Sequence, residues 1–316
     1  MAELQQEVDL VATGFREARK IPRKRDTWEI LFSGHESMPP PHRPDPRSWS
    51  NDTVTAAWIG HATVLINFYG TMILTDPVFS MRAGLSIMGM FTLGTKRLVV
   101  PALTIDELPP IDLILISHAH MDHLDLQSLR KFNRNIPVIM AANTSDIIED
   151  MRFTSVTEVD WTHRVEVAGL SVEGLRVKHF GWRYPWEKDR SRGNFEGRSY
   201  NAYLISKNGK HIVFGGDSAY QEHFKSLGER GIEIELAIMA IGAYDPWIGV
   251  HSTPEEAVAM ANHMRAKAIM PIHWGTFILS DEPTKEPIER LKANLLHHSP
   301  SLALEMVGET WKMPPQ

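Results

Sequence analysis

The sequence predicts an α+β fold in which strands and helices follow one another irregularly. Many segments are short, apolar or alternating in polarity, and bounded by turn residues, which is typical of β-strands. Fewer segments show the helical spacing of apolar residues, and they lie between only some of the strands. This order is compatible with two sheets sandwiched between helices and unlike strict βαβ alternation. With 316 residues, 43% of them hydrophobic, the chain can bury a large core, and we expect one catalytic domain.

An extension is expected to precede this domain over residues 1–51. Apolar residues at helical spacing predict an amphipathic helix over residues 4–20. The helix could pack on the domain or on a second subunit, or it could touch an anionic membrane together with the basic residues 23–25. The proline-rich residues 39–46 cannot continue a helix and predict an extended connection. The catalytic domain is therefore expected over residues 52–316.

The expected strands and helices are assigned in chain order from these patterns. The strands are residues 54–58, 63–68, 72–74, 113–116, 137–140, 164–167, 172–177, 201–206, 211–214, 236–239 and 268–271. The helices are residues 124–132, 145–150, 253–264 and 286–296. The third helix has a clear start signal, because Thr253 can cap it, Pro254 occupies its first turn and two glutamates follow.

Four potential metal ligands lie within six residues, directly after the apolar strand that ends at Ser117. They are His118, His120, Asp122 and His123. Imidazole nitrogen suits zinc, iron, nickel and copper, and a carboxylate adds hard oxygen character that lowers the net charge of a two-ion cluster. The alternative is a polar surface turn that happens to be rich in histidine. The density of ligands favours a dinuclear metal site, with two zinc ions as the best match and manganese or iron as the other candidates.

Three further strands end in a potential ligand: His179, Asp217 and His273. A two-ion site requires such groups, because each ion needs at least three protein ligands. Each residue alone is weak evidence, since a histidine at a strand end is often a polar cap and an aspartate after two glycines is often a turn residue. Gly215 and Gly216 would let the backbone approach the ions closely. The joint pattern carries the prediction.

In order and residue type, these seven positions resemble the metallo-β-lactamase superfamily of hydrolases. The resemblance implies a four-layer αββα sandwich and two divalent metal ions. It implies that one ion is held by His118, His120 and His179, that the other is held by Asp122, His123 and His273, and that Asp217 bridges the two.

Short motifs between Trp58 and Phe277, among them Gly60-His-Ala-Thr63, resemble the N-acylphosphatidylethanolamine-hydrolysing phospholipase D branch of that superfamily. This resemblance implies a phospholipid substrate, phosphatidic acid and an N-acylethanolamine as products, and a position for His251 near the substrate. The related ascorbate-6-phosphate lactonase group shares the ligands and the Gly-His-Ala-Thr element. A hydrolase of a lactone or a soluble phosphodiester is therefore the alternative, and a metal-binding scaffold without turnover is a third hypothesis.

The expected reaction is hydrolysis of a phosphodiester by a metal-bridged hydroxide, because metal binding lowers the pKa of water towards neutrality. Asp122 is expected to act as a catalytic residue that ligates one ion and orients the hydroxide. Asp217 is expected to fix the separation of the ions. His251 is expected to contact the substrate or the leaving group.

Asp76 and His61 have two readings each. Asp76 could hydrogen-bond a metal-bound histidine, as carboxylates around metal sites do, or it could cap the turn before Pro77. His61 could line the site, or Gly60 and His61 could simply shape a turn between two strands.

Two segments near the motifs could contact substrate. The uncharged residues 83–95 lack a clean period and contain methionines, which favours a loop that adapts to acyl chains; a buried loop or a subunit interface is the alternative. The segment Trp182–Trp186, with Arg190 and Arg192, could hold a phosphate or could be ordinary surface.

Composition limits the classes of partner. The formal net charge of −6 and the pI near 6.2 argue against a nucleic-acid-binding protein. The absence of cysteine excludes disulfides and thiolate ligands. The N-terminus has acidic residues where a secretory signal would be basic, and no run reaches the ~20 apolar residues that span a bilayer. We therefore expect a cytoplasmic protein, soluble or peripherally attached to a membrane, and a homodimer remains open.

Overall fold

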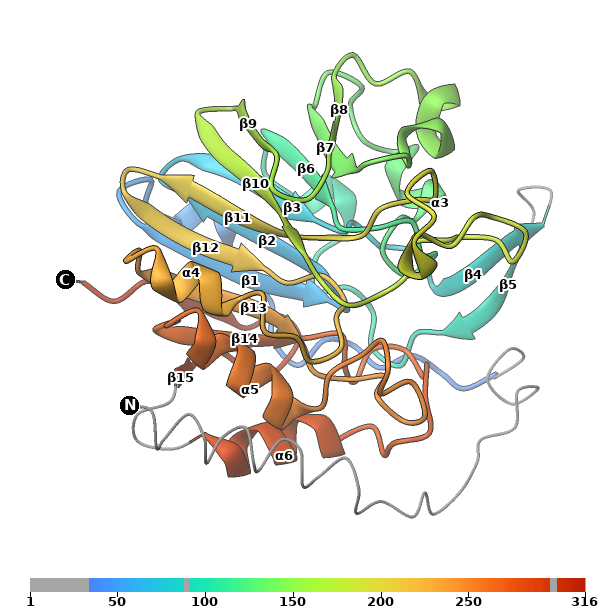
Figure 1. Cartoon of the computed structure of the whole chain (residues 1–316). Helices are drawn as coiled ribbons and strands as arrows, with labels where there is room; N and C mark the ends of the chain where they lie inside the picture. Colours follow the sequence, from blue (N-terminus) through green and yellow to red (C-terminus); the bar gives the residue numbers. More distant parts are fainter. Residues whose placement is uncertain (1–33, 88–90, 296–299, 316) are drawn as a thin grey trace.

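Two seven-stranded β-sheets face each other across a shared core in the computed structural model, which describes residues 34–87, 91–295 and 300–315 (Figure 1). The first sheet has the order β16 (Thr310–Lys312), β1 (Val54–Gly60), β2 (Thr63–Phe68), β3 (Thr71–Thr75), β6 (Leu113–Ile116), β7 (Val138–Ala141) and β8 (Val156–Val159). Strands β16 to β3 pair antiparallel, and β3 to β8 pair parallel.

The second sheet repeats this mixture of antiparallel and parallel pairs. Its order is β15 (Ser301–Leu302), β14 (Ala268–Ile272), β13 (Ile234–Ala240), β12 (Lys210–Phe214), β11 (Asn201–Lys207), β10 (Leu170–Arg176) and β9 (Arg164–Val167). Strands β9 to β12 pair antiparallel, and β12 to β15 pair parallel. The carboxyl ends of the parallel strands therefore meet at one edge of each sheet.

Helices form the outer layers. The α-helices are α3 (Leu126–Leu129), α4 (Lys225–Glu229), α5 (Pro254–His263) and α6 (Glu286–Asn294), and single 3₁₀ segments are η1 (Pro46–Ser48), η2 (Ile105–Glu107), η3 (Ser145–Met151) and η4 (Arg190–Arg192). Helix α5 begins as expected, because the Thr253 hydroxyl accepts from the Glu256 N–H and the Glu256 carboxylate accepts from the Thr253 N–H. The helix expected over residues 124–132 is only one turn long.

Three packed cores separate the layers. On β6, Leu113 and Leu115 face the core between the sheets, whereas Ile114 and Ile116 pack against the short helices outside the first sheet. A third core joins the second sheet to α4, α5 and α6 (Figure 1). Each fully buried Leu or Ile side chain contributes about 1.5–3 kcal/mol, so this alternation fixes which face of each strand lies inside. The α+β fold and its four-layer αββα sandwich are confirmed, with a thin outer layer on the first sheet.

Residues 83–95 form most of a hairpin, so the expectation of an irregular loop was wrong. Strands β4 (Arg82–Ile87) and β5 (Phe91–Lys96) pair antiparallel, and the hairpin extends away from the two large sheets (Figure 1). Gly84 lies opposite Gly94, where a Cβ on Gly84 would lie 2.1 Å from the Leu93 carbonyl oxygen. The two strands are stabilised by pairing with each other, and the alternation of polar and apolar residues in either strand alone does not reveal this pairing. Residues 88–90 lie outside the described part of the chain, so contact of this segment with lipid stays a prediction.

The described part of the N-terminal extension runs along the domain. The Met38 N–H donates to the Leu98 carbonyl at 2.7 Å, and the Val100 N–H donates to the Met38 carbonyl at 3.0 Å. The proline-rich stretch is extended except for the single turn η1, which Asp45 caps. The helix expected over residues 4–20 and the basic residues 23–25 lie outside the described residues. The division at residue 52 therefore remains a prediction.

Every expected strand overlaps an observed strand, and the strands that were missed are short or lie at an edge. Besides the hairpin, they are β8, β15 and β16. The segment expected as a helix at residues 145–150 is the 3₁₀ segment η3.

Candidate metal centre

All seven expected ligands and His251 converge at one edge of the sandwich, with His61 beside them. They come from turns at strand ends or, for His251, from the segment before α5. His118, His120, Asp122 and His123 follow β6, His179 follows β10, Asp217 follows β12, and His273 follows β14. Both sheets thus contribute to the site.

The first group of donor atoms has the spacing of a four-coordinate ion. His120 Nδ1 lies 2.8 Å from His118 Nε2 and 3.2 Å from His179 Nε2. Asp217 Oδ2 lies 3.9 Å from both of those Nε2 atoms. Tetrahedral zinc with bonds of 2.0–2.1 Å would separate its ligand atoms by about 3.3 Å. The three imidazoles and one carboxylate therefore fit an ion of this kind.

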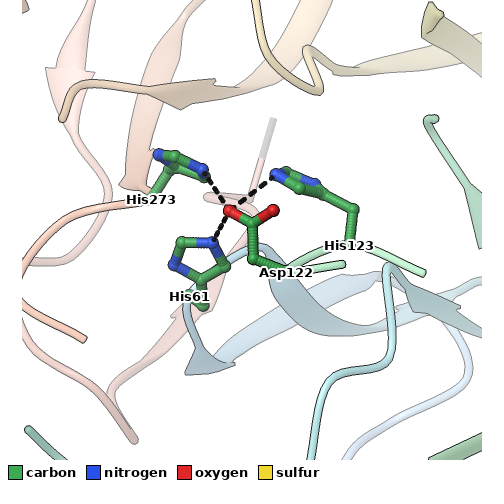
Figure 2. A group of neighbouring side chains, drawn as sticks. All are labelled: His61, Asp122, His123 and His273. Atoms are coloured by element: carbon green, nitrogen blue, oxygen red, sulfur yellow. Dashed lines mark hydrogen bonds and ion pairs between the residues drawn. The ribbon is translucent and has the colours of Figure 1, made fainter. Parts of the chain in front are cut away.

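The second group surrounds Asp122. Figure 2 shows the Asp122 carboxylate between three imidazoles, with Oδ2 at 3.0 Å from His61 Nε2, 3.3 Å from His273 Nε2 and 3.7 Å from His123 Nε2. Asp217 Oδ2 lies 3.1 Å from His123 Nε2 and 3.3 Å from His273 Nε2. Since the same oxygen borders the first group, Asp217 occupies the position that a bridging ligand requires.

His251 also faces the shared carboxylate. Its Nδ1 lies 3.8 Å from Asp217 Oδ2, and its ring stacks on that of His273 with centroids 5.4 Å apart. Among the residues that the structure describes, His251 Nδ1 and Asp217 Oδ1 are buried without a hydrogen-bond partner. Buried polar atoms without partners are costly, which is typical of a site whose bound ion or substrate supplies the missing contacts. The donor set and its unpaired atoms fit a divalent metal.

The backbone at three positions in and beside the two groups adopts a left-handed conformation that L-residues rarely take. The φ values are 55° at His61, 32° at Asp76 and 62° at His273. The His61 carbonyl accepts from the His273 N–H at 3.1 Å and from the Trp58 indole at 2.7 Å, while the His61 N–H donates to Thr276 Oγ1 at 3.1 Å. These bonds hold a strained backbone in place, as is common at functional sites.

Gly216 is required by packing. Its φ is +54°, and a Cβ there would lie 2.7 Å from the Asn201 carbonyl oxygen and 2.9 Å from Ser117 Cβ. The expectation that the two glycines let the backbone approach the ions stays a prediction. The chain after β12 passes closely between Asn201 and Ser117 before it reaches Asp217.

Buried hydrogen bonds orient the rings. Asp76 accepts from the Ser117 N–H at 2.7 Å and from the Ser117 hydroxyl at 2.6 Å, and its Oδ2 lies 2.6 Å from His123 Nδ1. His118 Nδ1 lies 2.9 Å from the same hydroxyl oxygen. Of its two expected roles, Asp76 takes the one that fixes a histidine of the cluster. Such contacts leave the opposite ring nitrogen, Nε2, free to face the centre.

The segment after His179 supports the ligand turn from outside. His179 Nδ1 lies 2.8 Å from the Val250 carbonyl oxygen, which directs Nε2 inward. Buried Arg183 donates to the carbonyls of Ala119 and Leu124, at 2.6 and 3.0 Å, at either end of the turn. Arg183 is a supporting residue that the sequence reading missed, because its partners are backbone groups and leave no pattern in the sequence.

Arg190 does not serve a phosphate, contrary to one reading of its segment. It is buried and donates to both carboxylate oxygens of Asp160, at 2.6 and 2.8 Å. A buried guanidinium needs a carboxylate partner, and the Asp160 carboxylate takes the place at Arg190 that a phosphate would need. Arg192 is exposed and lies 3.3 Å from Asp189.

Burial keeps most imidazoles of the cluster neutral. It lowers the pKa of His120 to about 3, with the nearby His179 adding to the effect. Burial likewise lowers the pKa of His118 and His251 well below the usual range. Neutral imidazoles are the form that binds metal ions.

The carboxylates stay ionised because their neighbours, and not burial, determine their pKa values. Burial alone would raise the pKa of Asp122 and Asp217, but His123 and the neighbouring imidazoles outweigh it and hold both pKa values well below the usual range. For His123, burial is outweighed by Asp217, Asp122 and Asp76, which raise its pKa. At neutral pH the metal-free cluster therefore combines neutral imidazoles, among them His118 and His120, and a protonated His123 with two ionised carboxylates, and a divalent cation would take the place of the His123 proton.

Stability of the metal-free protein is expected to fall as the pH drops from 7 to 5. The pKa of about 3 for His61 and His120 lies below the ordinary 6.5, so the unfolded state takes up protons first and is favoured as the pH falls below 6.5. The lowered pKa values of Asp122 and Asp217 act in the same direction at lower pH, whereas His123 and Asp76, whose pKa values are raised in the folded protein, oppose them. Urea midpoints of chelator-treated protein at pH 7, 6 and 5 test this, and a midpoint that rises on acidification would contradict it.

Comparison with known proteins decides the family. The model of the beta-lactamase superfamily domain matches residues 71–274, which include all seven expected ligands. The chain belongs to the β-lactamase superfamily. It is a hydrolase of the metallo-β-lactamase type, and its histidine and aspartate groups could hold metal ions.

Relatives include two N-acyl-phosphatidylethanolamine-hydrolysing phospholipases D. Phospholipase D 1 of this kind from Caenorhabditis elegans is 28% identical over 285 residues, which cover 83% of this chain and 77% of that protein. The mitochondrial enzyme of Saccharomyces cerevisiae is 30% identical over 247 residues, 74% of this chain, and the match spans only half of the yeast protein. Among solved structures, Igni18, a metallo hydrolase of Ignicoccus hospitalis, superposes with a TM-score of 0.61 at 18% identity, covering 84% of this chain and all of that one. That structural likeness supports the fold.

In the described part of the chain, no helix combines the length and apolar character needed to cross a membrane.

Proposed function

We propose that this protein is a zinc-dependent phosphodiesterase of the phospholipase D type, which hydrolyses N-acylphosphatidylethanolamine to phosphatidic acid and an N-acylethanolamine. The observation that carries the proposal is the similarity to the Caenorhabditis elegans enzyme of that name, which extends over 83% of the chain. A peripheral contact with the membrane, a cytoplasmic location and a homodimer are compatible extensions of it.

The arrangement of the cluster supports hydrolysis of a diester. Two bound divalent ions supply an activated water and neutralise charge on the phosphoryl oxygens. Asp217 lies between the two groups and holds them at a fixed separation. Asp122 Oδ2 lies within 3.7 Å of a nitrogen of three imidazoles, and in the proposed reaction this carboxylate would orient the attacking water.

His251 is the group available to the substrate. Its burial keeps the imidazole neutral, so it can offer a hydrogen bond to the oxygen of the leaving group. Aromatic rings beside the first group would suit the apolar part of a lipid: Phe180 lies 4.4 Å from the His120 ring, and Trp182 lies 4.8 Å from Phe180. These contacts favour a substrate with an apolar chain next to the reacting phosphate.

One panel of substrates tests the proposal. Purified protein is assayed by mass spectrometry with N-acylphosphatidylethanolamine, phosphatidylethanolamine, bis(p-nitrophenyl) phosphate and a lactone, before and after chelation and again after addition of Zn²⁺. We expect phosphatidic acid and N-acylethanolamine in equal amounts from the first substrate, loss of both on chelation, and recovery with zinc.

The other outcomes reject the proposal in distinct ways. Turnover of the soluble diester or the lactone without the phospholipid would establish the alternative hydrolase. Failure of zinc-loaded protein to act on any member of the panel would favour a binding protein.

A further inference from the structure

His61 lies in the second group without belonging to the ligand set that the superfamily pattern implies. Its side chain is 1% exposed and comes from the turn between β1 and β2. The backbone of this turn is fixed on both sides, by Thr276 at the His61 N–H and by Trp58 and His273 at the carbonyl. The imidazole is therefore delivered to one position with little freedom.

The imidazole meets one carboxylate. His61 Nε2 lies 3.0 Å from Asp122 Oδ2, and the centroid of its ring lies 4.2 Å from that of His273 (Figure 2). The His61 ring also lies 5.0 Å, edge-on, from the Phe277 ring. An ionised carboxylate only accepts hydrogen bonds, so the proton of the neutral ring belongs on Nε2. His61 thus donates to Asp122 while Asp122 faces the centre.

A second observation concerns Asp217, the carboxylate that the two groups share. The shared oxygen, Asp217 Oδ2, has a nitrogen of each of five histidines within 3.1–3.9 Å: His118, His123, His179, His251 and His273. The structure gives His61 no such contact with Asp217; its polar contact is with Asp122. It therefore borders the second group on the side of Asp122.

We propose that His61 is a positioning residue that fixes the carboxylate of Asp122 through its Nε2–H and thereby sets the affinity of the second group for its ion. The proposal rests on the metal site and is independent of the identity of the substrate. Loss of an outer hydrogen-bond partner of a metal ligand typically weakens metal binding about 10–100-fold.

Two amide variants separate positioning from folding and from ligation. In His61→Gln the side-chain N–H₂ reaches the position of Nε2, whereas in His61→Asn it reaches only the position of Nδ1. Asn is among the residues that best tolerate the positive φ of 55° at this site, so His61→Asn should fold. His163→Asn, at an exposed position, is the matched control.

Zn²⁺ affinity is measured by competition with a chromophoric chelator, and the ligand field by the visible spectrum of Co²⁺-loaded protein. We expect His61→Asn to lower the affinity for one of the two Zn²⁺ ions about 10–100-fold and to leave the affinity for the other unchanged. His61→Gln should stay within a few-fold of the parent protein, and the Co²⁺ spectrum of His61→Gln should be unchanged.

Parent-like affinity in His61→Asn would overturn the proposal. So would equal losses in both variants with a changed Co²⁺ spectrum, since that result would make His61 a ligand. A protein that binds Zn²⁺ as expected but does not hydrolyse the phospholipid would refute the proposed function and leave this inference standing.

Discussion

Asp217→Asn is expected to reduce turnover of any substrate by more than the ~10–100-fold that follows loss of an outer partner of a metal ligand. Asp217 Oδ2 is the atom common to both groups, so the amide removes negative charge from the place where two cations would otherwise repel each other. We also expect the variant to retain at most one metal equivalent. Steady-state kinetics and elemental analysis of the same preparation measure the two effects.

Asp52→Asn is the matched control, because Asp52 is exposed and hydrogen-bonds only locally with Ser50. It should leave both turnover and metal content unchanged. Parent-like turnover of Asp217→Asn with two equivalents of metal would remove Asp217 from the bridging role.

Removal of the metal ions is expected to abolish activity and to lower the Tm by roughly 10 °C or more. An ion present at 1,000 times its Kd stabilises the folded state by about 4 kcal/mol, and each kcal/mol shifts the Tm of a domain of this size class by about 2–4 °C. Chelation also leaves buried ionised carboxylates beside imidazoles without the cations that compensate them. Thermal melts with and without chelator at fixed pH test this.

Re-addition of Zn²⁺, Mn²⁺ or Fe²⁺ to the chelated protein identifies the ion that restores both the Tm and turnover. Mg²⁺, which prefers oxygen ligands in octahedral geometry, should restore neither. Full activity in metal-free protein, or a Tm indifferent to chelation, would show that the cluster does not hold functional ions.

The ligand positions were readable from the sequence because each follows a strand that is apolar enough to recognise. His118 to His123 directly follow the continuous apolar run of β6, and β14 leads in the same way to His273. In such a fold, strand ends at the same edge meet, so position along the chain carries information about position in space. The choice of Asp217 as the bridging residue came from the resemblance and stays a prediction, while its Oδ2 borders both groups.

Other parts of the site could not be read in this way. Arg183 acts on two backbone carbonyls, and the part that His61 plays depends on a contact with Asp122 across 61 positions of the chain. The β4–β5 hairpin was missed because its two strands are stabilised by each other and Gly84 and Gly94 weaken their individual strand signals. These features depend on pairing between distant residues, which neither composition nor period records.

The division of the ligands between the two sheets has a consequence for how the protein matures. The first group joins His118 and His120 from one sheet to His179 from the other, and the second joins Asp122 to His273 in the same way. Neither half of the chain alone holds all the expected ligands of either group, so a nascent chain should bind both ions in full only after both halves have docked. Once captured, the ions act as crosslinks between those halves, and their release should be coupled to separation of the sandwich at this edge.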